Sequence, residues 1–215
     1  MESIFLKLYS DISKFNVSRE TCLEFEAFIS MIEERNKKIN LISRKIVEKS
    51  SIRHRHIIDS LQIIDFVDLN SNTTTDLGTG GGMPGVLIAI MMKKIQNKMK
   101  INLYEKSFNK CIFLQDVSKK LKLNTEIIQK DIFSIKNICT GTIMSRAFKP
   151  LPVILNLIND NFYKYKNIIL FMGSSGKKIL TNSLKEWDLD YEEKESLTNK
   201  DSFLLNIKKI IKKKI

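Results

Sequence analysis

From about residue 73 onwards, two kinds of apolar pattern follow one another along the chain. Short β-prone runs are followed by longer stretches in which the apolar residues have helical spacing. The expected strands are Thr73–Leu77, Ile101–Tyr104, Glu126–Ile128, Thr142–Met144 and Asn167–Phe171. The expected helices are Pro84–Lys94, Asn109–Leu121, Leu151–Asn159 and Lys177–Leu184. This alternation predicts parallel βαβ units with right-handed crossovers.

Both ends of the chain depart from this alternation. Leu189–Glu195 and Ser202–Ile207 are strand-like and only a short turn separates them, which predicts an antiparallel finish to the sheet. The N-terminal part has helical spacing instead, at Ile4, Leu8, Ile12 and Phe15, at Cys22, Phe25, Phe28, Ile29 and Ile32, and over about His56–Val67. Ser18 is the expected N-cap of the second of these helices. We therefore expect an α/β fold: a helical N-terminal extension over residues 1–70 and one compact domain over residues 71–215.

A glycine-rich segment joins the first expected strand to the helix that follows it. Residues 74–90 read TTDLGTGGGMPGVLIAI, and five of the eight glycines of the chain fall between residues 78 and 85. Glycines cluster where the backbone needs a positive φ or approaches a ligand closely. Pro84 suits the first turn of a helix, so the segment predicts a helix N-terminus that presents free N–H groups to a nucleotide-like ligand.

Two nucleotide-binding motifs overlap in this segment. Residues 80–85 match G-x-G-x-x-G, and Glu105 follows at the spacing of a dinucleotide fingerprint, which would make the protein a nicotinamide-dependent oxidoreductase. Asp76, Gly78, Gly80 and Gly82 instead match the D-x-G-x-G-x-G pattern of methyltransferases that use S-adenosylmethionine. We favour the second motif, because a glycine already stands directly at the strand end. No Gly-Lys-Ser/Thr follows, which excludes a Walker loop.

Polar residues at the ends of the later strands are further candidates for a ligand site, since ligands bind at the carboxyl ends of such strands. Glu105 is suited to a ribose diol, because a carboxylate only accepts hydrogen bonds. Asp131 is suited to an adenine amino group, with Ile132 and Phe133 against the ring. Arg146 is suited to the carboxylate of a cofactor or to an RNA phosphate. The alternatives are a surface charge for Glu105 and Arg146 and a helix cap for Asp131.

Composition adds a limited constraint. The net charge is +12, but 30 of the 36 basic residues are Lys, a bias that an A/T-rich coding sequence also produces. The charge therefore supports a nucleic-acid partner only in part, and the basic tail 208–215 is either solvated or in contact with phosphates. Three widely spaced cysteines predict free buried thiols in a reducing cytoplasm. Two histidines close together and no nearby cysteine predict no metal site, and no segment predicts a signal peptide or a membrane span.

Three further segments accompany the glycine loop. They are Asn36–Ser43, Arg55–Leu61 and Ser145–Phe148. Together with Asp76–Gly85, in this order, they resemble the bacterial small-subunit ribosomal RNA guanine-N7 methyltransferase family (RsmG, formerly GidB). The resemblance extends from about residue 20 to the C-terminus.

The resemblance implies a class I Rossmann-like methyltransferase fold, with a mostly parallel seven-stranded sheet and an antiparallel C-terminal strand. It implies S-adenosylmethionine as methyl donor, 16S ribosomal RNA as partner, and guanine 527 in a conserved loop near the decoding site as target. We expect a cytoplasmic monomer. The cofactor-binding residues carried over by motif are Asp76, Gly78, Gly80, Gly82, Met83, Glu105, Asp131, Ile132, Phe133 and Arg146. Arg146 would also border the methyl-transfer site.

The chain departs from the family pattern at three positions. Arg35 stands where the family usually has Trp, Met172 where it has Lys, and Ser202 near a usual Arg. A non-catalytic RNA-binding relative is therefore a third hypothesis.

Overall fold

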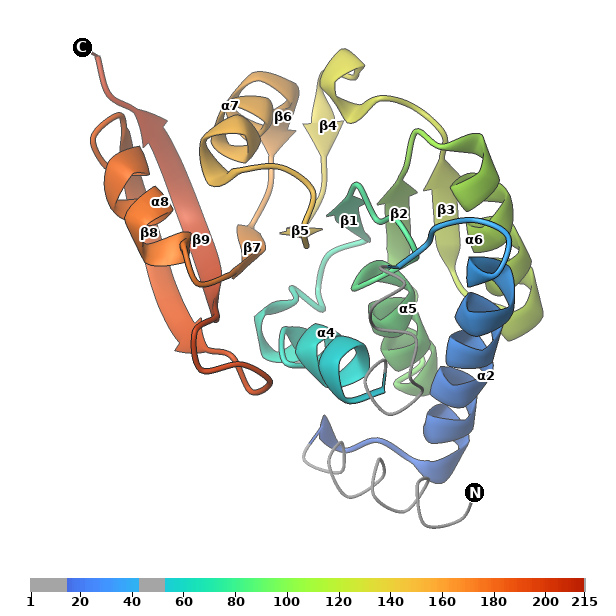
Figure 1. Ribbon diagram of the computed structural model, residues 1–215. Helices are drawn as coiled ribbons and strands as arrows, with labels where there is room; N and C mark the ends of the chain where they lie inside the picture. The colour runs from blue at the N-terminus through green and yellow to red at the C-terminus, as the bar shows by residue number, and fades with distance from the viewer. Residues whose placement is uncertain (1–14, 43–52, 215) are drawn as a thin grey trace.

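The computed structural model describes residues 15–42 and 53–214, so most of the first expected helix lies outside the described residues. Its centre is one seven-stranded sheet in the order β3-β2-β1-β5-β7-β9-β8 (Figure 1). The strands are β1 (Thr73–Leu77), β2 (Lys100–Tyr104), β3 (Thr125–Ile128), β5 (Thr142–Ser145), β7 (Asn167–Met172), β8 (Trp187–Glu195) and β9 (Phe203–Lys212). β9 pairs antiparallel with both β7 and β8, and the other strand pairs of this sheet are parallel, which confirms the predicted sheet and its antiparallel finish.

Helices cover both faces of this sheet. They are α2 (Arg19–Asn36), α4 (Asp59–Leu61), α5 (Gly85–Lys94), α6 (Phe108–Leu121), α7 (Leu151–Asn161) and α8 (Gly176–Ser183). Successive side chains of a strand point to opposite faces, so β7 places Ile169 in the core beneath α2, α5 and α6, and Ile168 and Leu170 in the core beneath α7 and α8. The result is a three-layer arrangement of helices, sheet and helices.

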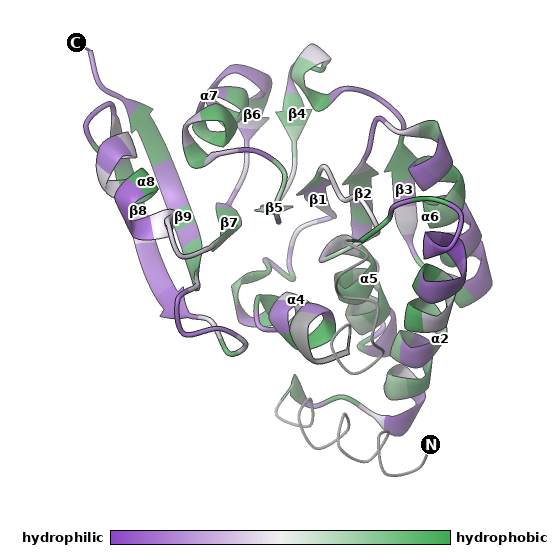
Figure 2. Cartoon of the chain, in the orientation of Figure 1, coloured by the Kyte–Doolittle hydropathy of each residue, from purple (hydrophilic) through white to green (hydrophobic). Residues whose placement is uncertain are grey.

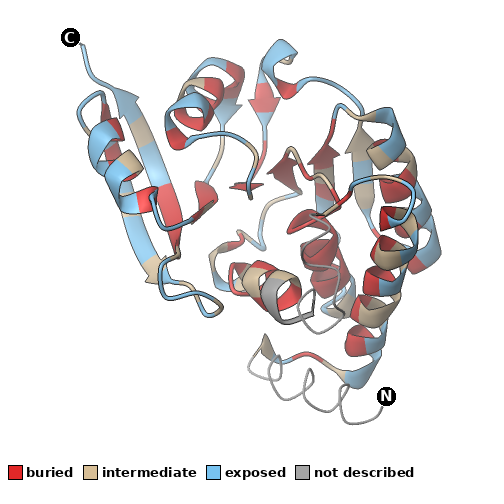
Figure 3. Cartoon of the chain, in the orientation of Figure 1, coloured by how far each residue is buried: buried red, intermediate tan, exposed pale blue. Residues whose placement is uncertain are grey.

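The N-terminal helices belong to the first of these cores. Phe25, Phe28 and Ile32 of α2 are fully buried against α5 and α6. This packing explains why α5 is apolar all round: Val86–Met92 are all buried, and the helix is largely green in Figure 2 and red in Figure 3. As expected, Ser18 is the N-cap of α2, and its Oγ accepts a hydrogen bond from Thr21 N–H at 3.3 Å. The boundary proposed near residue 70 stays a prediction.

The single helix expected over residues 56–67 is wrong. The chain forms a π-helical segment η3 (Arg53–Ile58), the short α4, and a 3₁₀ turn η4 (Ile64–Phe66). The apolar spacing predicts which face of the segment is buried, but it does not predict the hydrogen-bond pattern of its backbone. Here Asp59 and Gln62 form hydrogen bonds with the loop between β8 and β9. The π-helical turn lies next to them, and such turns are frequent at functional sites.

Two smaller expectations need correction. The last expected strand ended at Ile207, but β9 continues to Lys212 alongside β8, so most of the basic tail is strand. Cys22 and Cys111 are buried, but Cys139 is exposed in β4 (Ile138–Cys139), which pairs with β6 (Phe162–Lys164) in a small second sheet. No helix within the described ranges is long and apolar enough to cross a membrane.

The topology fixes where a ligand site can form. From β1 the strand order runs to β2 and β3 on one side and to β5 and β7 on the other. The crevice at such a reversal lies between the carboxyl ends of β1 and β5. The glycine loop follows β1 and Arg146 follows β5, so both lie at this crevice.

Candidate functional site

The glycine loop turns sharply between β1 and α5. Gly78, Gly80 and Gly82 have φ values of +64°, +59° and +95°. At Gly78 a Cβ atom would lie 2.1 Å from Cδ2 of Phe148, and at Gly82 it would lie 2.7 Å from Cγ2 of Val86. Glycine is needed at these two positions for the backbone conformation and for the close approach of a neighbour.

Asp76 stabilises this loop from the interior of the protein. One carboxylate oxygen, Oδ2, accepts hydrogen bonds from Thr79 Oγ1 at 2.6 Å and from Gly85 N–H at 2.9 Å. Burial, the largest cause, raises the pKa of the carboxyl to about 6 from its ordinary 3.8, although the two hydrogen bonds act in the opposite direction. Asp76 is fully buried and is not among the pocket-lining residues, so it supports the loop.

The N-terminus of α5 differs from the expectation. The first N–H group, of Gly85, is bonded to Asp76, and the N–H of Val86 is bonded to the carbonyl of Gly82. The prediction that these groups face a ligand is therefore wrong. The backbone that faces the pocket is that of Gly78–Gly81 instead.

Glu105 lies directly after β2 and touches the loop. Its Oε2 accepts a hydrogen bond from Gly80 N–H at 3.1 Å, and its Oε1 accepts one from Ser107 N–H at 2.8 Å. The side chain is nearly buried and lines the pocket. The surface-charge alternative is therefore wrong for Glu105. A carboxylate accepts about four hydrogen bonds, so each oxygen keeps capacity for one more donor.

The segment after β3 forms another part of the wall. Asp131 caps a 3₁₀ turn, η5 (Ile132–Ser134), and its Oδ1 accepts a hydrogen bond from Phe133 N–H at 3.1 Å. Asp131, Ile132 and Phe133 all line the pocket, so the capping role and a ligand-facing position occur together. Asn161 at the end of α7 donates to the carbonyls of Ile132, Phe133 and Ile135 and holds this segment in place.

Arg146 stands at the opposite end of the pocket, directly after β5. Its Nη2 forms an ion pair with Oδ2 of Asp59 at 2.8 Å, and its guanidinium carbon lies 5.7 Å from the centre of the Phe171 ring. Only 15% of the side chain is exposed, which contradicts the surface-arginine alternative. One partner of Arg146 in this structure is therefore a carboxylate of the protein, which the sequence did not predict.

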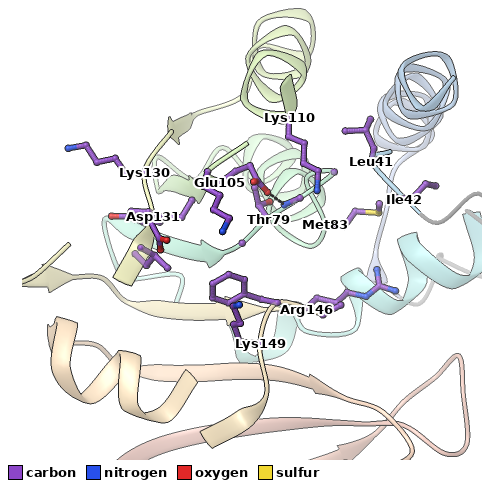
Figure 4. Close-up of a pocket in the computed structure, with 18 of the residues that line it drawn as sticks. Leu41, Ile42, Thr79, Met83, Glu105, Lys110, Lys130, Asp131, Arg146 and Lys149 are labelled. Atoms are coloured by element: carbon purple, nitrogen blue, oxygen red, sulfur yellow. Dashed lines mark hydrogen bonds between the residues drawn. The ribbon is translucent and has the colours of Figure 1, made fainter. Parts of the chain in front are cut away.

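These residues surround an open pocket of about 540 Å³, a size typical of small-ligand sites. Figure 4 shows Lys130 and Asp131 at one end, Leu41, Ile42 and Arg146 at the other, and Glu105 with Thr79 between them. Gly78, Gly80 and Met83 also line it, whereas Gly82 and Asp76 stand behind the lining. The structure thus brings together eight of the ten predicted site residues.

Several lining residues were missed by the sequence analysis. Leu41, Ile42 and Phe148 were part of the quoted motifs but received no role. Asn36 fixes the first two, because its Oδ1 accepts from Leu41 N–H at 2.8 Å and from Ile42 N–H at 3.1 Å. Four lysines also line the pocket at its rim: Lys106, Lys110, Lys130 and Lys149. No sequence pattern distinguishes them from the other lysines among the 30 of the chain.

Comparison with known proteins identifies the family of this chain. The family model GidB, described as rRNA small subunit methyltransferase G, matches residues 21–208. A ribosomal RNA small subunit methyltransferase G of Pelagibacter ubique (strain HTCC1062) is 57% identical over 213 residues, which are 99% of this chain and 100% of that protein.

Two solved structures share the fold at low sequence identity. A SAM dependent methyltransferase from Aquifex aeolicus has a TM-score of 0.53 at 12% identity and covers 76% of this chain and 95% of its own. The 16S rRNA methylase RmtB has a TM-score of 0.53 at 11% identity and covers 90% of this chain and 76% of its own.

The sheet order, the antiparallel hairpin and these neighbours define the Rossmann-like fold of S-adenosylmethionine-dependent methyltransferases. Within that class the matched model and the Pelagibacter relative are decisive. The chain belongs to the GidB family, rRNA small subunit methyltransferase G, which confirms the resemblance drawn from the four sequence segments.

Proposed function

We propose that this protein transfers a methyl group from S-adenosylmethionine to N7 of a guanine in 16S ribosomal RNA. Membership of the family supports an rRNA substrate, and a ribosomal substrate implies action in the cytoplasm. The observation that carries the cofactor assignment is Glu105: a nearly buried carboxylate, oriented by Gly80 and Ser107, with acceptor capacity left on both oxygens.

The pocket residues fit the parts of this cofactor. Glu105 would accept hydrogen bonds from the two ribose hydroxyls, and Asp131 would accept from the adenine amino group beside the partly exposed Phe133. The backbone of Gly78–Gly81 and the side chain of Met83 would hold the methionine end. The bound cofactor supplies an electrophilic methyl group on a sulfonium.

Guanine N7 needs little chemical assistance from the protein. It is a bare lone pair at the edge of the base, so no proton has to be removed before it attacks. Catalysis then depends on alignment and on the placement of charge. No cysteine is among the pocket-lining residues that the structure describes, which suits a reaction without a thiolate nucleophile.

The rim of the pocket suits an RNA partner. Lys106, Lys110, Lys130 and Lys149 would pair with phosphates around the target nucleotide. Met172, which departs from the family pattern, is 8% exposed and packs in the core below α8 and not in the pocket. This departure therefore gives no support to a non-catalytic relative.

The experiment that tests the proposal measures transfer of a tritiated methyl group to small-subunit RNA, both free and assembled, from cells that lack the modification. We expect incorporation at one guanine, which chemical cleavage at 7-methylguanine locates. No incorporation into either substrate, or incorporation at another atom, would contradict the proposal. Calorimetry with S-adenosylmethionine and with NAD tests the oxidoreductase alternative, which predicts binding of NAD.

A further inference from the structure

The carboxylate of Asp59 connects three segments that are distant in sequence. Its Oδ2 pairs with Arg146 at the end of β5, at 2.8 Å. Its Oδ1 accepts hydrogen bonds from Gln62 Nε2 at 2.7 Å, from Thr198 Oγ1 at 3.0 Å and from Ser196 Oγ at 3.4 Å. The two oxygens thus differ in function: neutral donors surround one, and the other faces the arginine.

Gln62 fixes this arrangement from the side of α4. It is fully buried, and its Oε1 accepts a hydrogen bond from Leu197 N–H at 3.0 Å. Its Nε2 donates to Asp59 and lies 3.5 Å from Ser196 Oγ. The loop between β8 and β9 is therefore bonded to the N-terminal extension at two points, the carboxylate of Asp59 and the amide of Gln62.

The arginine that this network holds lies at the ligand pocket. Arg146 lines the pocket, and its guanidinium lies against the Phe171 ring as well as Asp59. Only 14% of the Asp59 side chain is exposed, so solvent screens this ion pair little. An arginine side chain has many rotamers, and a fixed carboxylate on one side with a ring on the other restricts them.

We propose that Asp59 is a positioning residue for Arg146, and that through it the N-terminal extension and the β8–β9 loop set the arginine at the methyl-transfer end of the pocket. Asp59 itself is not placed in contact with the cofactor or the base. The proposal rests on the proposed function only for its kinetic readout, because the restricted arginine is a property of the protein alone.

The test compares Asp59→Asn with the matched control Asp65→Asn. Asp65 also joins the N-terminal extension to β8, through an exposed ion pair with Lys194 at 3.2 Å, but it does not touch Arg146. NMR of arginine side-chain N–H groups reports the restriction of Arg146, whose signals are assigned by their absence in Arg146→Lys. Single-turnover methylation gives the rate, and calorimetry gives the affinity for S-adenosylmethionine.

We expect Asp59→Asn to broaden or shift the Arg146 signals and to lower the methylation rate by about tenfold to a hundredfold, as misplaced catalytic groups do. The affinity for S-adenosylmethionine should change less than about threefold, and Asp65→Asn should change none of these quantities. A purely structural role for Asp59 predicts a lower melting temperature with a normal rate per folded molecule.

Unchanged Arg146 signals in Asp59→Asn would overturn the proposal, and so would altered signals with an unchanged rate. If Asp59→Asn does not fold, Thr198→Val removes one neutral donor to Oδ1, and smaller changes in the same direction are expected. If the wild-type protein methylates no RNA, the proposed function fails while the NMR comparison still decides whether Asp59 positions Arg146.

Discussion

Replacement of Gly78 by Ala tests the link between the glycine loop and the aromatic wall of the pocket. The new Cβ would lie 2.1 Å from Cδ2 of Phe148, far inside van der Waals contact, on a backbone with φ of +64°. The substitution therefore has a backbone component and a steric component, which can be separated.

The magnitude follows from these two components. A left-handed conformation costs a non-glycine residue about 1 kcal/mol. Overpacking costs about 1–3 kcal/mol, and the lower part of that range applies because Phe148 is only half-buried and its ring can move aside. We expect the free energy of unfolding to fall by about 2–3 kcal/mol, which lowers the melting temperature by about 4–12 °C for a chain of this length. Displacement of the Phe148 ring into the pocket should also weaken S-adenosylmethionine binding.

Gly173→Ala is the matched control. At Gly173 a Cβ would meet no atom within 4 Å, and its backbone φ is not in the positive region. We expect its free energy of unfolding to change by less than about 0.5 kcal/mol. Urea unfolding and calorimetric titration of S-adenosylmethionine measure both variants under the same conditions.

A double-mutant cycle with Phe148→Ala isolates the steric component of the loss in free energy of unfolding. If the Phe148 ring causes this component, adding Gly78→Ala to Phe148→Ala should cost only the backbone component, about 1 kcal/mol. Equal costs in both backgrounds, or a Gly78→Ala variant as stable as Gly173→Ala, would refute the reasoning.

Three other predictions concern the residues around the loop. The folded-state pKa of Asp76, about 6, lies above its ordinary 3.8, so folding takes up a proton between these values. The free energy of unfolding of the wild type, relative to that of Asp76→Asn, should therefore fall by on the order of 3 kcal/mol as pH rises from about 4 to 6. Free energies from urea unfolding that depend on pH in the same way in both proteins would contradict this. Asn161→Ala removes the hydrogen-bond donors to the segment after β3 and should weaken S-adenosylmethionine binding about tenfold. Asn159→Ala, at an exposed position of the same helix, should leave the affinity unchanged. Equal affinities of the two variants in calorimetry would show that the segment keeps its conformation without Asn161. Glu105→Gln turns one of the two acceptors toward Gly80 or Ser107 into a donor and should weaken S-adenosylmethionine binding at least about tenfold. Glu126→Gln, at an exposed position of β3, is the control. An unchanged affinity of Glu105→Gln would exclude Glu105 from the cofactor site.

The seven strands of the central sheet and the helices between them follow from local patterns in the sequence, whereas the short strands β4 and β6 were not predicted. Apolar runs of strand length, such as Asn167–Met172, and amphipathic stretches, such as Phe108–Leu121, have periods that only one kind of element can bury. The positive φ values at Gly78, Gly80 and Gly82 are likewise local, since few other residues adopt them. Glu105 and Asp131 could be predicted because the ends of parallel strands meet at one edge.

The failures have a common cause. The segment 53–66 has an apolar helical face, but its backbone pattern depends on Asp59 and Gln62 meeting the β8–β9 loop, more than 130 residues away in sequence. The N–H groups of Gly85 and Val86 are used within the loop because Asp76 and Gly82 reach them, which depends on the exact path of the turn. Neither feature leaves a periodic signal.

The sequence by itself determined the sheet with its helices, the glycine turn and the family, because these depend on local periodicity and on residue types at fixed spacing. Only the tertiary structure decided that Asp76 faces inward, that Phe148 covers Gly78 and that Arg146 pairs with Asp59. These contacts join segments far apart in the chain, and their partners are selected by packing and burial, which no single stretch of sequence encodes.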